Sequence, residues 1–156
     1  MGFNVLLNQS KQIVKKSSSI SLIGVENWGS GGFKKKGNLD LALESNELND
    51  FKILMSHDPT HWQEKVINHQ QHIDLTLSGH THGMQFGIEI PGWIKWSPIQ
   101  YRYKYWAGLY KEMGQFINVN RGFGFLAYPG RVGIYPEISI IDLKIMKTDK
   151  SKDEFS

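Results

Sequence analysis

Three histidines stand where two apolar stretches of this chain end, and they are the residues best suited to bind a metal ion. His57 follows the stretch 51–56, whereas His80 and His82 follow the stretch 73–77. Both stretches read as β-strands, and neutral imidazoles delivered at strand ends have the fixed placement that zinc, manganese, iron, cobalt or nickel requires. The pattern therefore predicts that the three histidines form half of a metal site.

Glycines flank the two closely spaced histidines, since Gly79 precedes His80 and Gly83 follows His82. Glycine permits a sharp turn and lets the backbone approach an ion or a phosphate closely. In a regular strand the two imidazoles would point to the same face, but in a tight turn they diverge and can serve two different ions.

Each histidine also has an ordinary structural interpretation. A His-x-His pair often lies in a surface turn and binds no metal. His57 alone could cap the following helix or be a core residue whose polar atoms are hydrogen-bonded. The joint pattern at two neighbouring strand ends favours the metal site. The remaining histidines show no converging spacing and are read as surface or packing residues; they are His61, His69 and His72.

Composition narrows the chemistry further. A chain of 156 residues is normally one domain, and this one has no cysteine, so disulfides and thiolate metal sites are excluded and any metal needs nitrogen and oxygen ligands. The net charge is +3, and the dense cationic run Lys34–Lys36 lies in a glycine-rich loop without an aromatic or arginine-rich stripe. We therefore predict no nucleic-acid binding. No apolar segment approaches the roughly 20 residues that span a bilayer, which predicts a soluble chain.

The elements that must position the histidines can be read from apolar alternation and breaker residues. Asp58-Pro59 is typical of a helix start, with an N-cap followed by proline, and the helix is expected to run to about His72. A second helix is expected over 40–49 with Asp40 as its cap. Strands are expected at 3–8 and 12–16, forming a hairpin around 9–11, and at 19–25, 51–56, 74–78, 115–120 and 136–145.

Strand, helix and strand with short connections over 51–78 predict a parallel βαβ unit. Residues 83–114 are rich in glycine, proline and aromatic side chains and read as a long irregular excursion beside the paired histidines. The polar residues 147–156 are predicted to be a disordered tail, which leaves 1–146 as the folded part.

At this point the residues resemble a known family. Ser56-His57-Asp58-Pro59, followed by Leu77-Ser78-Gly79-His80-Thr81-His82-Gly83-Met84-Gln85, is similar to the C-terminal half of calcineurin-like metallophosphoesterases. The likeness is greatest to the bacterial subgroup whose last motif reads G-H-T-H-G-G-Q. Further resemblances cover nearly the whole chain up to Lys144; they lie at 3–8, 23–27, 120–124 and 131–138.

The resemblance implies an α/β fold with an α+β tendency: the C-terminal half of a four-layer α/β/β/α sandwich, with 1–146 a single partial domain. It implies hydrolysis of phosphate mono- or diesters by a hydroxide that two divalent transition metals activate, drawn from Mn, Fe, Zn or Co. His57 and His80 would bind one ion and His82 the other, with Gly79, Gly83 and Gln85 in the substrate pocket. Met84 stands where the subgroup usually has glycine and could narrow that pocket.

The family motifs D-x-H, G-D-x-x-D and G-N-H-D/E have no match in this sequence. They supply the remaining metal ligands and the histidine near the leaving group, so we expect no catalytic residue within this chain, partial metal occupancy, and little or no activity in isolation. The chain is expected to pair with a missing N-terminal half or to self-associate. Membrane tethering through an absent N-terminal segment is a further implication of the resemblance.

Two other functions stay open at this stage. The chain could be a non-catalytic module that binds a metal or a phosphate, or a partner-binding protein that uses the aromatic residues from Trp93 to Tyr110. Substrate, native metal and oligomeric state are not contained in the sequence.

Overall fold

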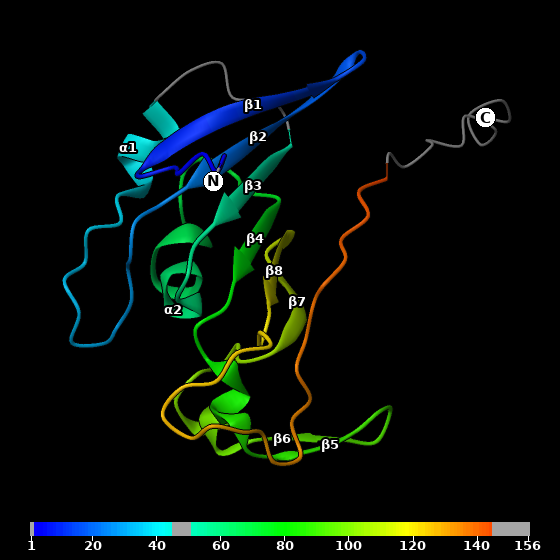
Figure 1. Ribbon diagram of the computed structural model, residues 1–156. Helices are drawn as coiled ribbons and strands as arrows, with labels where there is room; N and C mark the ends of the chain where they lie inside the picture. Colours follow the sequence, from blue (N-terminus) through cyan, green and yellow to red (C-terminus); the bar gives the residue numbers. More distant parts are fainter. Residues whose placement is uncertain (1, 45–50, 145–156) are drawn as a thin grey trace, which may run out of the picture.

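A six-stranded mixed sheet forms the centre of the computed structural model, which describes residues 2–44 and 51–144 (Figure 1). The strands lie in the order β1-β2-β3-β4-β8-β7, and β2, β3, β4 and β8 run parallel to one another, whereas β1 and β7 form antiparallel edges. Their bounds are Gln9–Lys15 (β1), Ser18–Gly24 (β2), Lys52–Met55 (β3), Leu75–Ser78 (β4), Gly108–Glu112 (β7) and Gln115–Val119 (β8). The predicted α/β class with a mixed sheet is confirmed.

One parallel βαβ unit positions the candidate site. After β3, Asp58 accepts a hydrogen bond from the backbone N–H of Thr60 at 2.9 Å and begins α2 (Pro59–His61). Proline is tolerated there because the first turn of a helix has no partner for its N–H. The π-helical turn η1 (Trp62–Val66) continues α2, and the chain then returns as β4. The βαβ unit and its helix start are confirmed, but the helix ends near Val66 instead of continuing to about His72.

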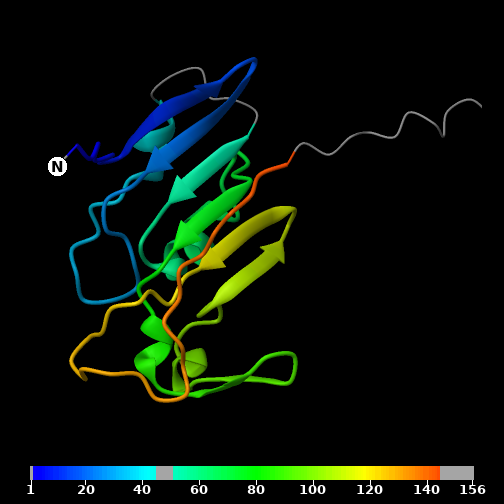
Figure 2. The same ribbon diagram turned by 45° about the vertical axis from the view of Figure 1, so that its right-hand side comes forward.

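The hydrophobic core lies between the sheet and its helices. Ile23, Leu54 and Ile117 project from the strands and are fully buried against Trp62 of η1. The short helix α1 (Leu39–Glu44) adds Leu39, Ala42 and Leu43 to the same cluster. Figure 2 shows α1 and α2 on one side of the sheet, while residues 136–144 run along the opposite side. The sheet is therefore packed by helices on one face alone within the described ranges.

The first hairpin is displaced from its predicted position. The expected turn residues 9–11 lie inside β1, and the turn falls between β1 and β2, where Lys16 has φ of 58°. Asn8 explains the difference. Its amide side chain forms hydrogen bonds with Glu26 and with the backbone of Lys36 and Asn38. These bonds hold the segment before β1 in a loop conformation.

The predicted N-cap of α1, Asp40, is wrong. The side chain of Asn38, not Asp40, accepts a hydrogen bond from the backbone N–H of Leu41 at 3.0 Å. Residues 45–49 of the predicted helix lie outside the described residues, as do residue 145 and the predicted tail 147–156.

The excursion 83–114 is more regular than predicted. It contains a two-stranded antiparallel ribbon of β5 (Ile88–Ile90) and β6 (Ile94–Trp96), the 3₁₀ turn η3 (Pro98–Tyr101) and the edge strand β7. Its aromatic residues divide: Tyr103, Tyr105 and Trp106 are buried, whereas Trp93 and Tyr101 are exposed. The buried ones, together with the half-buried Tyr110, pack the excursion onto the body.

The predicted strand over 136–145 is wrong for its described part. Residues 136–144 are extended but form no ladder, because they cross a face of the sheet and not one of its edges (Figure 2). Ser139 marks the crossing, since its hydroxyl accepts a hydrogen bond from the side chain of Asn120 at 2.8 Å. None of the helices in the described ranges has both the length and the apolar character needed to traverse a bilayer.

Candidate functional site

The ends of β3 and β4 bring two of the three predicted histidines together. The strands are parallel neighbours, so their carboxyl ends meet at one edge of the sheet, and the backbone N–H of Gly79 donates to the carbonyl of His57 at 3.0 Å. His57 and His80 extend from these two ends. Their rings lie 5.0 Å apart, centre to centre, at an interplanar angle of 79°.

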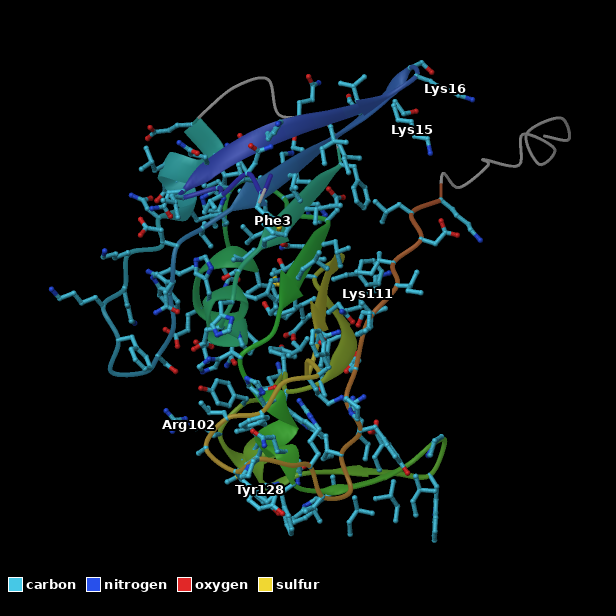
Figure 3. All side chains as sticks on the ribbon, in the orientation of Figure 1. Phe3, Lys15, Lys16, Arg102, Lys111 and Tyr128 are labelled. Atoms are coloured by element: carbon cyan, nitrogen blue, oxygen red, sulfur yellow. The ribbon has the colours of Figure 1, made fainter. Side chains whose placement is uncertain are left out.

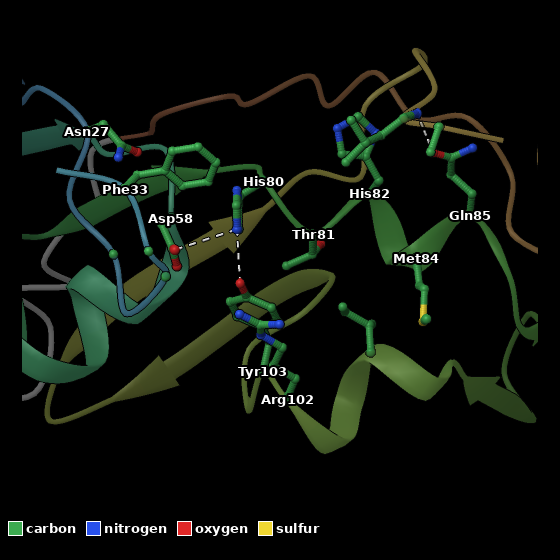
Figure 4. A pocket seen from close by; sticks show the side chains of 16 residues that line it. Asn27, Phe33, Asp58, His80, Thr81, His82, Met84, Gln85, Arg102 and Tyr103 are labelled. Carbon is green, nitrogen blue, oxygen red and sulfur yellow. Dashed lines mark hydrogen bonds and ion pairs between the residues drawn. The ribbon is translucent and has the colours of Figure 1, made fainter. Parts of the chain in front are cut away.

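The facing atoms of this pair are Nε2 of His57 and Nδ1 of His80, which lie 3.2 Å apart. The other nitrogen of His80, Nε2, lies 2.9 Å from the hydroxyl of Tyr103 and 3.6 Å from Oδ2 of Asp58 (Figure 4). When Nε2 carries the proton and donates it to these oxygens, the lone pair of Nδ1 faces His57.

This geometry fits a shared cation. Two nitrogen ligands at about 2.0–2.1 Å from one ion lie roughly 2.8–3.0 Å apart at an octahedral angle and roughly 3.3–3.4 Å apart at the tetrahedral angle. The distance of 3.2 Å between the two imidazole nitrogens falls between these values. Histidines that bind metals usually donate their other N–H to a carboxylate or another acceptor, and Nε2 of His80 lies within reach of two such oxygens. Within residues 2–44 and 51–144, no group of three or more His, Asp or Glu side chains converges to complete such a site.

His82 does not join the pair. Figure 4 shows His80 directed toward Asp58 and Tyr103, whereas His82 lies apart from it beyond Thr81. Its Nδ1 is buried and has no hydrogen-bond partner in the structure. Burial, Arg131 and His57 all lower the pKa of His82, so its ring is held neutral. A neutral imidazole with an unused buried nitrogen is suited to a ligand that the described residues do not supply.

The turn between the histidines owes its shape to backbone angles that L-residues seldom adopt. His80, His82, Met84 and Gln85 have φ between 51° and 69°, in the left-handed region. Thr81 anchors the turn, because its hydroxyl donates to the carbonyl of Trp106 at 2.7 Å. Strain of this kind persists where the surroundings impose it and clusters at functional sites.

Burial also lowers the pKa of His57, and the neighbouring His80 lowers it further. The neutral form of His57 is the one that can bind a metal.

Two buried oxygens near the pair were not assigned to the site from sequence. They are the Asp58 carboxylate, interpreted only as a helix cap, and the Tyr103 hydroxyl. Asp58 could have been suspected from its position directly after His57.

Close packing explains how Asp58 reaches His80. Oδ1 of Asp58 accepts from the backbone and the hydroxyl of Thr60, at 2.9 and 2.8 Å, which leaves Oδ2 facing His80. Gly29 lies against this carboxylate, and a Cβ atom there would come 2.1 Å from Oδ2. The glycine is therefore needed for the carboxylate to occupy its place.

A pocket of about 400 Å³ opens beside His80 (Figure 4). Its walls include Phe33, Met84, Arg102, Tyr103 and Leu126, together with both His80 and His82. Of the predicted substrate-pocket residues, Gln85 lines this pocket, whereas Gly79 and Gly83 are not among the lining residues. The pocket combines apolar walls with two charged groups, the Arg102 guanidinium and the Asp58 carboxylate.

The chain is 36% identical over 110 residues to an uncharacterized metallophosphoesterase, YkuE, of Bacillus subtilis, which covers 69% of this chain and 37% of that protein. It is 28% identical over 142 residues to the phosphodiesterase YaeI of Escherichia coli, which covers 91% of this chain and 48% of that protein. No family model and no solved structure gives a significant match.

The chain thus spans less than half the length of each of these curated relatives. Their names agree with the chemistry that two facing imidazoles and an adjoining pocket can support. At low identity, the two relatives support a metallophosphoesterase family for this chain.

Proposed function

We propose that this chain is the C-terminal portion of a metal-dependent phosphoesterase that hydrolyses phosphate mono- or diesters. The observation that carries the proposal is the 3.2 Å approach of His57 and His80 at the ends of neighbouring parallel strands. The similarity to proteins named metallophosphoesterase and phosphodiesterase supports the reaction class. The substrate and the native metal are left open between Mn, Fe, Zn and Co.

His57 and His80 would hold one divalent cation, and His82 would contribute to a second. When bound, such a cation polarises a phosphoryl oxygen and stabilises the charge that develops during hydrolysis. Asp58 and Tyr103 would keep His80 oriented by accepting its Nε2 proton. Arg102, in the wall of the pocket, would attract the phosphate.

We further propose that the isolated chain has little or no phosphoesterase activity. Two neutral imidazoles leave a cation with most of its water and its full charge, so it binds weakly. The carboxylate ligands that complete a dinuclear site would come from protein that precedes this chain in the full-length product.

Calorimetric titration of the purified chain with Mn²⁺, Zn²⁺ and Co²⁺ tests the metal site. We expect weak binding that is lost in His57→Gln and in His80→Gln. His72→Gln is the matched control, because His72 is exposed and remote from the paired rings. Binding that survives both His57→Gln and His80→Gln would contradict the assignment.

Turnover of a generic phosphodiester with Mn²⁺ tests the reaction. The chain extended by its upstream coding sequence should hydrolyse the diester and lose this activity in His80→Gln, whereas the isolated chain should not. Robust turnover by the isolated chain that His80→Ala abolishes would overturn the claim of inactivity and retain the reaction class.

A second function agrees with the same observation. The described residues contain no three-ligand group, which is what a non-catalytic module for metal or phosphate binding would also show. Metal binding that depends on His80, together with an inactive extended chain, would select this alternative.

A further inference from the structure

An unusual number of large apolar side chains is exposed on the loop 122–131. Phe123 is 77% exposed, Phe125 64%, Leu126 70% and Tyr128 61%. Isolated exposed apolar residues are ordinary on protein surfaces, but a contiguous group of them marks a site of interaction. These four residues occur within six positions, so they form one patch.

The patch continues around the mouth of the pocket. Leu126 and Ala127 share the pocket wall with Phe33, which lies on the loop 27–37 and is largely exposed, and with Met84. Figure 3 places Arg102 and Tyr128 at the same end of the molecule, far from Lys15 and Lys16 at the tip of the first hairpin. Three loops, 27–37, 97–103 and 121–131, thus form one surface, which we call the loop face.

The loop face is positively charged. Its three loops contain six lysine and arginine residues and no aspartate or glutamate. Arg121 is paired with Glu137 and Glu89, and Arg131 donates to backbone carbonyls of Arg121 and Gly124. The exposed cations are therefore concentrated in Lys34, Lys35 and Lys36 on one loop and Arg102 on the next.

The apolar side chains are presented by a fixed backbone. The side-chain amide of Gln85, which is buried, donates to the carbonyls of Tyr128 and Gly130 at 2.7 and 2.6 Å and accepts from the N–H of Leu126. Because the backbone is held from the inner side, the loop cannot move further into the pocket without breaking these hydrogen bonds, and Leu126 remains 70% exposed although it lines the pocket wall. The four apolar side chains of the patch therefore remain exposed on the surface.

We propose that the loop face docks on an anionic lipid membrane, with Phe123, Phe125 and Leu126 entering the interface and the cations contacting the headgroups. Exposed aromatic and aliphatic side chains beside a cluster of lysines have the properties of a membrane-surface site. A second copy fits less well, since a symmetric contact would set the same cationic loops against each other. This inference is independent of the metal site.

Co-sedimentation with vesicles tests the proposal. The full chain should pellet with vesicles that contain phosphatidylglycerol and not with phosphatidylcholine alone. The triple variant Phe123→Ser/Phe125→Ser/Leu126→Ser should lower binding at least tenfold, and Lys34→Ala should lower it about fivefold. The controls are Val14→Ser and Lys15→Ala on β1, which change an exposed apolar residue and an exposed cation outside the loop face.

Three results would overturn the proposal. One is the absence of binding to anionic vesicles. Another is a triple variant that still binds like the wild type while its circular dichroism is unchanged. The third is a dimer in solution that the triple variant dissociates, because it would assign the patch to a second copy of the chain.

Discussion

At the scale of the residue, Gly29 shows how the site depends on one missing methyl group. A Cβ atom there would meet the Asp58 carboxylate at 2.1 Å, whereas a Cβ on Gly32 would meet nothing within 4 Å. We expect Gly29→Ala to destabilise the chain by about 1–3 kcal/mol, the usual cost of overpacking. Gly32→Ala should leave the free energy of unfolding nearly unchanged or raise it slightly. Urea unfolding measures the stability of the two variants. Equal unfolding midpoints would contradict the close contact between Gly29 and the Asp58 carboxylate.

His61 provides a second prediction at this scale. It is fully buried against Trp28 and Ser56, and burial, assisted by Lys65 and opposed by Asp58, lowers its pKa from 6.5 to about 4. The unfolded chain therefore binds a proton at a higher pH than the folded chain does. The resulting stability is complete above about pH 6.5 and is lost as the pH falls toward 4.

The expected loss is about 2 kcal/mol between about pH 7.5 and pH 5. Urea unfolding at both values measures it, and the loss should be smaller in His61→Gln. His72→Gln, at an exposed position, should behave as the wild type. An imidazole of His61 that titrates near 6.5 by NMR would contradict this account.

Some residues of the candidate site could be predicted from the sequence, and others could not. His57 and His80 were identifiable because each follows a strand, and the parallel pairing of those strands brings them together. Tyr103 was not identifiable, since it follows η3 and its contact with His80 depends on how the chain turns after β6. His82 was expected to diverge from His80 in a tight turn and to bind a second ion, and the backbone angles around Thr81 direct the two side chains apart.

At the scale of the element, Gln85 holds together the loop that it faces. Its amide makes hydrogen bonds with three backbone groups of residues 126–130. We expect Gln85→Ala to leave the sheet intact and to open this loop, because two carbonyls and one N–H lose their partners. Hydrogen exchange of Leu126 should accelerate at least tenfold, while exchange in β8 stays unchanged. Equal protection of Leu126 in both proteins would show that the loop has another anchor.

Strands were predictable from apolar alternation only where a partner strand was available. The pattern located β2, β3, β4 and β8 within a residue or two. It failed for 136–144, which alternates like a strand but crosses a sheet face, and for β7, which lay within a glycine-rich stretch read as irregular. Pairing is a tertiary property, so local pattern cannot settle it.

At the scale of the whole molecule, the sheet has a second apolar face, which residues 136–144 cross and which no helix of the described ranges covers. Ile53 and Leu75 are buried on this face, whereas Met55 and Leu109 are exposed. The registers align Leu22, Ile53, Leu75 and Phe116 in one row across four strands. A second row on the same face runs through Met55, Leu77, Asn118 and Leu109, so it is apolar except at Asn118. Parallel sheets are normally covered on both faces, and large exposed apolar faces drive association.

We therefore expect the isolated chain to self-associate through this face. Met55→Lys and Leu109→Lys place charges at two exposed positions of the second row and should dissociate the oligomer to a monomer by light scattering. Val14→Lys is the control, because Val14 is equally exposed but pairs with Ser19 on the helix-covered side of the sheet. A wild-type monomer at all concentrations would contradict the expectation. Addition of the N-terminal half that we propose for the full-length product should also dissociate the oligomer, since we expect that half to cover the same face.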